Sequence, residues 1–197
     1  MSVKNEQKGG LDGLAGEVQK STKRGPPPVH LWNPPFCGDL DMRIANDGTW
    51  FYMKSPIGRL PLVKLFASVL KVEDGKHFLV TPVEKVGITV DDAPFVAVEL
   101  TVENKGPEQT LTFRTNVDDI VTCDADHTLR FEPEEGTGGM KPYLHIRRGL
   151  WARVKQALFY DLAALGEERD HEGTRMFGVV SAGVFFPMAP AAELKIT

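Results

Sequence analysis

The chain has 197 residues, of which 42% are hydrophobic and 25% charged, and its formal net charge is −4. This composition is that of an ordinary globular protein and excludes a disordered or fibrous chain. The length allows one large domain or two small ones. The acidic balance gives phosphate backbones no general attraction, so we expect no nucleic-acid partner.

The sequence carries no signal for export or membrane insertion. The first residues lack the apolar core of a signal peptide, and no uninterrupted apolar run reaches the length of a membrane-spanning helix. Cys37 and Cys123 lie far apart and outside a Cys-x-x-Cys spacing, as a reducing compartment tolerates. We therefore expect a cytoplasmic protein without a membrane partner.

Residues 1–28 differ from the rest and are expected to form a flexible N-terminal arm. They are polar and end in Pro26-Pro27-Pro28, which favours an extended connector. A short amphipathic helix within the arm can dock onto the body or onto a neighbouring chain. Its apolar residues at helical spacing are Leu11, Leu14, Ala15 and Val18.

Residues 29–94 are predicted to form an N-terminal α+β half. Strand-like runs at 40–45 and 50–54 flank Asn46-Asp47-Gly48, which is typical of a tight hairpin turn. A helix then begins near Pro61, and a return strand at 78–81 follows the turn residues Asp74-Gly75. The apolar stripe of this helix comprises Leu62, Leu65, Phe66, Val69 and Leu70.

Residues 95–197 are predicted to form a β-rich C-terminal half with one long helix. Apolar and polar residues alternate over 96–103, and Leu111 and Phe113 continue the same face on the next strand. Further elements are expected in the order strand 129–131, strand 143–147, helix and strand 176–186. The helix carries an apolar stripe, Trp151, Val154, Leu158, Phe159, Leu162 and Leu165, and stops at Gly166.

The order hairpin, basic corner, helix and strand occurs in both halves. Aligning Leu65-Phe66 with Leu158-Phe159 also aligns Tyr52-Met53-Lys54 with His145-Ile146-Arg147 without a gap. We infer an internal duplication and an α+β fold of two related halves, with hairpin–helix–strand units and antiparallel sheets. The alternative is that any two strand–helix units share such a hydrophobic period.

Cations lie between strand and helix in both halves, with Lys54 and Arg59 in the first and Arg147, Arg148 and Arg153 in the second. Cations beside the free N–H groups of a helix N-terminus predict a carboxylate or phosphate site. The alternative is that these are solvated surface cations paired with carboxylates.

Other chemistry has weaker support. No two histidines have the spacing with which one strand or helix holds a metal. Asp39 with Asp41 and Asp124 with Asp126 could bind a hard cation, but we interpret them as turn and strand-start residues. We expect neither a metal nor a cofactor.

Cys37 lies in an irregular, proline-rich loop, and His30 is its nearest candidate base. We favour a buried structural cysteine over a nucleophile. The aromatic residues in and after this loop are interpreted as core: Trp32, Phe36, Trp50 and Tyr52.

Four segments, LWNPPFCGDLDMRI, SPIGRLPLVKLFASVL, FLVTPVEKVGITVDDAPFVAVEL and LTFRTNV, resemble the bacterial domain of unknown function 1285 family over residues 31–187. The resemblance implies an α+β fold with a duplicated motif, a C-terminal half loosely like a pleckstrin-homology barrel, and a ligand cleft between the halves. It implies no activity. Relatives are expected to have a polar, His-containing turn where this chain has 52–55.

Residues that match the family pattern provide candidate lining for the cleft, namely Thr81, Glu84, Arg114 and Asn116. The alternative is that they are structural and satisfy backbone groups.

We therefore expect a non-enzymatic binding, regulatory or signalling module that takes a small anionic ligand at the interface between its halves. The expected ligand-binding residues are Lys54, Arg59, Thr81, Glu84, Arg114, Asn116, His145, Arg147 and Arg148. An enzyme of unrecognised type, a hydrolase or transferase that uses Cys37 or Asp39 with Asp41, stays open. So do a protein-interaction adaptor and a homodimer formed through exposed strand edges.

Overall fold

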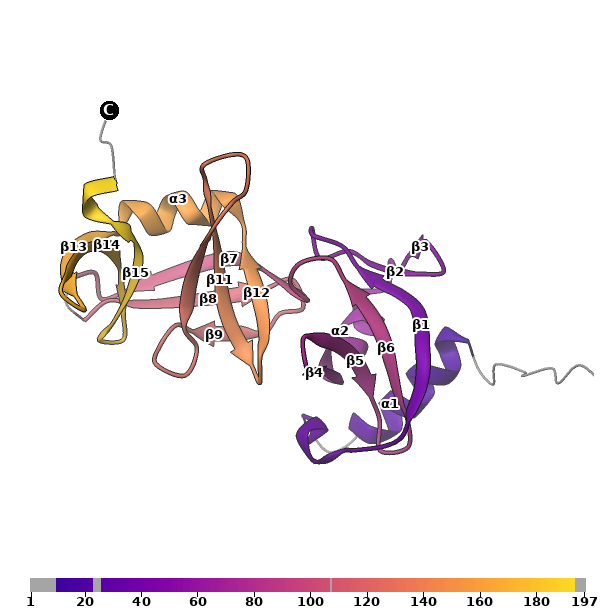
Figure 1. Ribbon diagram of the computed structural model, residues 1–197. Helices are drawn as coiled ribbons and strands as arrows, with labels where there is room; N and C mark the ends of the chain where they lie inside the picture. The colour runs from indigo at the N-terminus through magenta and orange to yellow at the C-terminus, as the bar shows by residue number, and fades with distance from the viewer. Residues whose placement is uncertain (1–9, 23–25, 107, 194–197) are drawn as a thin grey trace, which may run out of the picture. The chain divides into compact units, whose positions relative to one another are not determined.

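The structure is a computed structural model that describes residues 10–22, 26–106 and 108–193 (Figure 1). It is an α+β protein that divides into two compact units, residues 1–92 and 93–197. Within the described ranges, no helix is long and apolar enough to cross a bilayer.

Unit 1 contains one six-stranded sheet in the order β3-β2-β1-β6-β5-β4. Two antiparallel three-stranded meanders are joined at its centre by the parallel pair β1 and β6. The elements are α1 (Leu11–Thr22), the 3-10 turn η1 (Val29–Leu31), β1 (Phe36–Ile44), β2 (Trp50–Tyr52), β3 (Ser55–Pro56), α2 (Leu60–Ser68), β4 (Leu70–Glu73), β5 (Lys76–Val80) and β6 (Lys85–Val90).

The predicted first hairpin of unit 1 is confirmed. Ile44 pairs with Trp50, and the backbone N–H of Thr49 donates to Asp47 Oδ1 at 2.9 Å. Gly48 has φ +84°, which a residue without a Cβ adopts at no steric cost. Asp74-Gly75 also forms a tight turn, but it joins β4 to β5 rather than a helix to a strand.

The core of unit 1 lies between the sheet and α2, around which the sheet curls in Figure 1. Trp50 stacks on Phe66 of α2 with ring centroids 6.3 Å apart. α1 packs beside α2 and buries Leu14 and Val18, which confirms the docking predicted from its apolar face.

The predicted extent of α2 is wrong at its C-terminal end. The helix ends at Ser68, Val69 caps it, and Leu70 opens β4. Leu70 belongs to a strand because it pairs with Leu79 across the sheet. Local periodicity in the sequence cannot reveal such a partner strand.

Unit 2 contains a six-stranded sheet in the order β10-β11-β12-β7-β8-β9 and a three-stranded sheet in the order β13-β14-β15. α3 packs against β7 and β14. The elements are β7 (Phe95–Glu103), β8 (Thr110–Thr115), β9 (Ile120–Thr122), β10 (Leu129–Pro133), β11 (Met140–Arg147), β12 (Leu150–Val154), α3 (Gln156–Ala164), β13 (Glu167–His171), β14 (Thr174–Ser181), β15 (Val184–Pro190) and the 3-10 turn η2 (Ala191–Glu193).

Two predictions in unit 2 are wrong. Trp151 and Val154 lie on β12 rather than on the helix, because β12 pairs with β11 on one side and with β7 on the other. The expected strand 176–186 is a hairpin, in which Ala182 and Gly183 turn the chain with positive φ.

The two units share one order of elements: three strands are followed by a helix and then by three more strands. This order is β1-β2-β3-α2-β4-β5-β6 in unit 1 and β10-β11-β12-α3-β13-β14-β15 in unit 2. Tight turns follow Tyr52 in the first copy and Arg147 in the second, so Tyr52 corresponds to Arg147 and not to His145. The repeat supports the duplication, although the gap-free alignment was displaced by two residues.

Candidate ligand-binding pocket

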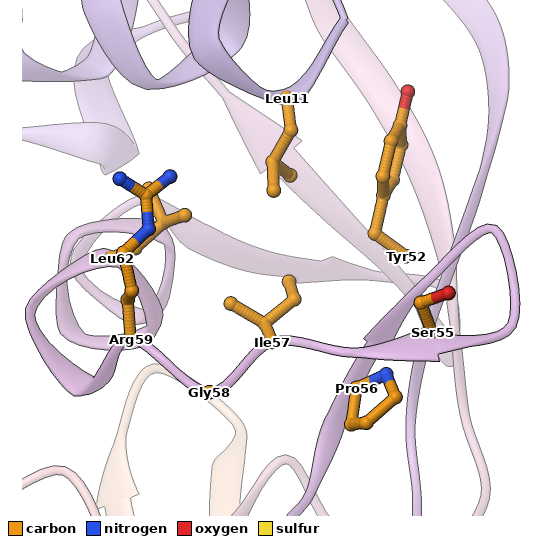
Figure 2. Close-up of a pocket in the computed structure, with 8 residues that line it drawn as sticks. All are labelled: Leu11, Tyr52, Ser55, Pro56, Ile57, Gly58, Arg59 and Leu62. Carbon is orange, nitrogen blue, oxygen red and sulfur yellow. The ribbon is translucent and has the colours of Figure 1, made fainter.

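Unit 1 contains a pocket of about 200 Å³ where β2, β3, the start of α2 and the first turn of α1 meet. Figure 2 shows Leu11 and Ile57 pointing toward each other, with Arg59 on one side and Tyr52 on the other. The lining residues are Leu11, Tyr52, Ser55, Pro56, Ile57, Gly58, Arg59 and Leu62. An apolar interior thus meets one guanidinium and two hydroxyl groups.

The backbone of the segment after β2 is held against the sheet by two hydrogen bonds. The N–H of Met53 donates to the carbonyl of Asp41 at 2.8 Å, and the N–H of Ile57 donates to the carbonyl of Trp50 at 2.7 Å. These bonds fix the Ile57 side of the pocket to the body of unit 1.

Arg59 occupies the N-cap position of α2. Its backbone is extended, and its carbonyl accepts the N–H of Leu62 at 3.0 Å, but its side chain makes no capping hydrogen bond. Pro61 fits the first turn because it needs no hydrogen-bond partner for a backbone N–H. The side chain of Arg59 is therefore not used to cap α2, and Figure 2 shows it along one side of the pocket.

Among the described residues, the guanidinium of Arg59 makes one ion pair, with Asp12 of α1 at 3.4 Å. The two side chains are 71% and 94% exposed. An ion pair this exposed contributes little to stability, so the Arg59 guanidinium can exchange its partner for another anion.

Tyr52 and Ser55 supply the two hydroxyl groups. Within the part of the chain that the structure describes, neither hydroxyl has a hydrogen-bond partner. The Tyr52 hydroxyl lies beside Gly10, where a Cβ would be 3.9 Å away. Both groups are thus available to a bound molecule.

The first predicted basic corner is only partly brought to this pocket. Lys54 lies in the β2–β3 turn with φ +66° and is exposed, but it does not line the pocket. Arg59 alone of this pair is a pocket residue.

The structure separates the cations of the second predicted corner. Arg147 donates to Asp119 Oδ2 at 2.7 Å and lies over the ring of Phe95, 5.0 Å from its centroid. Arg153 instead reaches Glu134 at 3.7 Å, and Arg148 lies exposed in the β11–β12 turn. These side chains do not form a single anion site.

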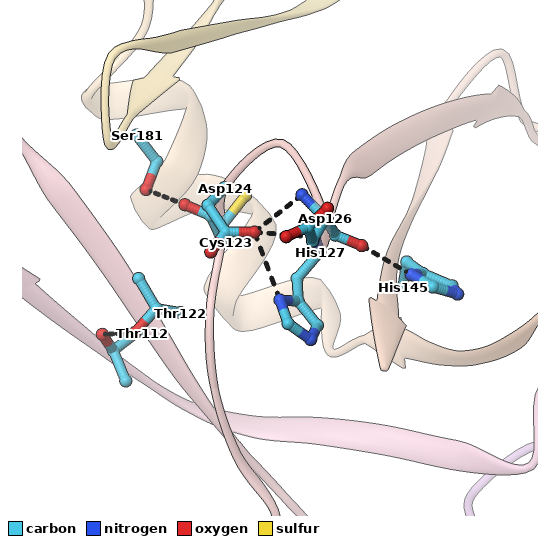
Figure 3. Close-up of polar contacts among 8 residues, drawn as sticks. All are labelled: Thr112, Thr122, Cys123, Asp124, Asp126, His127, His145 and Ser181. Atoms are coloured by element: carbon cyan, nitrogen blue, oxygen red, sulfur yellow. Dashed lines mark hydrogen bonds and ion pairs between the residues drawn. The ribbon is translucent and has the colours of Figure 1, made fainter. Parts of the chain in front are cut away.

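His145 is held by backbone groups in unit 2 (Figure 3). Its Nδ1 lies 2.8 Å from the carbonyl of Asp126, and its Nε2 accepts the N–H of Gly149 at 3.1 Å. The ring also packs against Trp151, with centroids 5.0 Å apart. Nε2 therefore fixes the β11–β12 turn, and Nδ1 ties that turn to the loop between β9 and β10.

Asp124 organises the loop before β10 (Figure 3). Its Oδ1 accepts the N–H groups of Asp126 at 2.9 Å and His127 at 2.8 Å. Partial burial raises the pKa of the Asp124 carboxyl, but these backbone hydrogen bonds outweigh it, and the pKa is lowered. The interpretation of Asp124 as a turn residue is confirmed.

Three of the four residues matched to the family pattern make structural bonds. Thr81 Oγ1 accepts the N–H groups of Val83 at 3.3 Å and Glu84 at 3.2 Å, which closes the β5–β6 turn. Asn116 Oδ1 accepts the N–H of Val96 at 3.0 Å. Glu84 takes part in this turn through its backbone N–H, which donates to Thr81 Oγ1.

Arg114, the fourth, is exposed and pairs with two carboxylates, Glu99 at 2.7 Å and Asp118 at 2.8 Å. The printed bonds of Arg114 go to carboxylates and not to the backbone groups expected in the structural alternative.

The interpretation of Cys37 as buried is wrong, and Phe36 is not a core residue. Cys37 is exposed and donates its thiol to the carbonyl of Pro35 at 3.4 Å. The Phe36 side chain is 55% exposed and meets Phe78 edge-on at 6.1 Å. Composition alone could not reveal that the start of β1 leaves both side chains exposed.

The pocket residues Leu11, Ser55, Ile57 and Leu62 were not among the predicted site residues. Leu11 was predicted to belong to a docking helix, but its position beside Ile57 depends on how α1 packs. No signal in the sequence links residues separated by this much chain.

Comparisons with known proteins agree with this fold. The family model described as "Domain of unknown function (DUF1285), N-terminal domain" matches residues 27–93, and "Protein of unknown function (DUF1285), C-terminal domain" matches residues 94–188. No curated protein matches the chain.

Two solved structures are similar to this chain. A DUF1285 family protein from Silicibacter pomeroyi DSS-3 is 49% identical with a TM-score of 0.85, over 93% of this chain and 98% of that chain. A DUF1285 family protein from Shewanella baltica OS155 is 29% identical with a TM-score of 0.50, over 64% of this chain and 92% of that chain. On both family-model matches and the 49% identity, the chain belongs to the DUF1285 family.

Proposed function

We propose that the protein is a non-enzymatic binding module with a regulatory or signalling role, and that it takes a small anionic ligand in the pocket of unit 1. The observation that carries this proposal is the position of Arg59. Its guanidinium lines an apolar pocket and is held by one exposed carboxylate at 3.4 Å. A few polar groups converging on a concave apolar site are the usual features of a ligand pocket.

The residues named for catalysis give no comparable support. The thiol of Cys37 donates to a backbone carbonyl rather than meeting a base. The carboxylate of Asp39 lies against Gly87, where a Cβ would come within 2.1 Å of Oδ1. Neither residue lines the pocket. The binding proposal therefore explains more of the geometry than an enzymatic one.

Thermal unfolding of the full chain tests the proposal, with a panel of organic carboxylates and phosphates as probes. A ligand that binds only the folded state raises the melting temperature in a saturable way. We expect this rise in the wild type and its loss in Arg59→Gln.

Lys54→Gln is the matched control, because it removes a nearby exposed cation that does not line the pocket. It should keep the ligand-dependent rise. An equal rise in Arg59→Gln and the wild type would contradict the proposed site.

A further inference from the structure

We infer that the pocket of unit 1 takes a monocarboxylate with a short apolar body, and that the carboxylate of this ligand replaces Asp12 on Arg59. This inference rests on the proposed function and adds the chemical class of the ligand. It also identifies an internal competitor for the site.

Asp12 shows which head group Arg59 accepts. A carboxylate matches the planar fork of a guanidinium. The Asp12 side chain is 94% exposed, so a ligand can displace it by rotation of that side chain. α1 itself need not unfold or leave, because the buried Leu14 and Val18 hold it in place.

The apolar walls define the body of the ligand. Leu11, Ile57 and Leu62 form much of the lining, and the volume is about 200 Å³. Pockets for drug-sized ligands span about 300–1,000 Å³. A short alkyl chain or a single ring therefore suits this pocket, whereas the hydroxyl groups of a sugar would lose hydrogen bonds to water against its apolar walls.

The number of cations disfavours a nucleotide. Among the described residues that line the pocket, Arg59 is the one basic residue. Sites for polyphosphates combine several cations, a metal ion or a glycine-rich loop. One guanidinium with neighbouring hydroxyl groups matches a single negative charge.

The local charge favours entry of anions into this part of unit 1. The chain is acidic overall, yet residues 48–72 contain no Asp or Glu. Of the cations in this stretch, Lys54 and Arg59 belong to the segment that borders the pocket, whereas Lys71 is paired with Glu73 at 2.8 Å. A local excess of positive charge raises the concentration of anions at the surface.

Two-dimensional ¹⁵N NMR titrations of the full chain test the inference. The probes are butyrate, hexanoate and benzoate, compared with inorganic phosphate and adenosine monophosphate. We expect the carboxylates to shift the backbone signals of Ser55, Ile57 and Arg59, with tighter binding of hexanoate and benzoate than of butyrate.

Two substitutions on α1 test the competition. Asp12→Asn should tighten carboxylate binding by about twofold to fivefold, because the competing exposed ion pair is lost. Glu17→Gln is the matched control, since Glu17 lies on the same helix, pairs with Lys20 and does not line the pocket. It should leave the affinity unchanged.

The outcomes separate this inference from the proposed function. Binding of phosphate or adenosine monophosphate but not of carboxylates, with dependence on Arg59, would overturn the ligand class and leave the proposed function standing. Equal affinity of Asp12→Asn and the wild type would overturn the competition. If no anion binds in an Arg59-dependent manner, the proposed function and this inference fail together.

Discussion

The backbone carbonyl oxygen of Phe186 lies so close to Gly178 that a Cβ added there would come within 2.3 Å of that oxygen. Gly178 pairs with Pro187 between β14 and β15, beside a register shift. Because the opposing group is backbone, it cannot move aside as a side chain would. This contact lets β14 and β15 approach each other closely in unit 2.

Gly178→Ala should therefore destabilise the protein by about 1–3 kcal/mol through overpacking. Urea unfolding followed by circular dichroism measures the change. Gly16→Ala is the control, because a Cβ there meets nothing within 4 Å. In helix α1 this control should stabilise by up to about 1 kcal/mol. A neutral effect of Gly178→Ala would show that the two strands separate easily.

Trp50 is buried in unit 1, and its indole Nε1 has no hydrogen-bond partner among the described residues. Trp50→Phe removes this unpaired donor, whose burial costs about 1–3 kcal/mol, but it also leaves a small cavity. The two effects oppose each other, so the free energy of unfolding should change by less than about 1 kcal/mol. Trp50→Ala should cost about 3–5 kcal/mol. Similar losses for both variants would mean that the indole N–H is satisfied in solution.

The two cysteines should differ in reactivity toward a thiol reagent such as iodoacetamide. Cys37 is exposed, whereas Cys123 is buried beneath Ser181, whose Oγ donates to the Cys123 carbonyl at 2.6 Å (Figure 3). Burial raises the pKa of the Cys123 thiol, and the nearby Asp124 carboxylate raises it further, so the reactive thiolate is scarce. Mass spectrometry should show one modified cysteine in the native protein and two in urea. Modification of Cys123 at the rate of Cys37 would contradict the burial.

Glu73 links stability to pH in unit 1. Hydrogen bonds from Lys71 at 2.8 Å and Lys85 at 2.7 Å lower the pKa of the Glu73 carboxyl. Because the folded state binds this proton less readily, the contribution of Glu73 is present at neutral pH. It is lost as the pH falls below the ordinary glutamate pKa toward the lowered folded value.

Glu73→Gln should therefore lose less stability on acidification than the wild type. Thermal melts between neutral and acidic pH measure the two slopes. Glu103→Gln, at an exposed position at the end of β7, should retain the wild-type slope. Parallel curves for the wild type and Glu73→Gln would refute the linkage.

Local chemistry in the sequence determined much of the fold. Asn46-Asp47-Gly48 produced a hairpin because Gly48 tolerates positive φ, and the alternation over 98–103 identified the half-exposed part of β7. The apolar face of α1 and the start of α2 near Pro61 also followed from residue spacing. These features depend on neighbours within one turn or one strand, which the sequence contains.

Tertiary structure alone decided the features that need a partner from elsewhere in the chain. Trp151 and Val154 lie on a strand because β7 and β11 flank β12, and Leu70 leaves the helix because β5 accepts it as a strand. In the same way, Arg59 is a pocket residue because Leu11 and Tyr52 surround it, whereas Arg147 is committed to Asp119. The sequence identified the cations, but hydrogen bonding and packing between distant segments determined which of them borders the pocket.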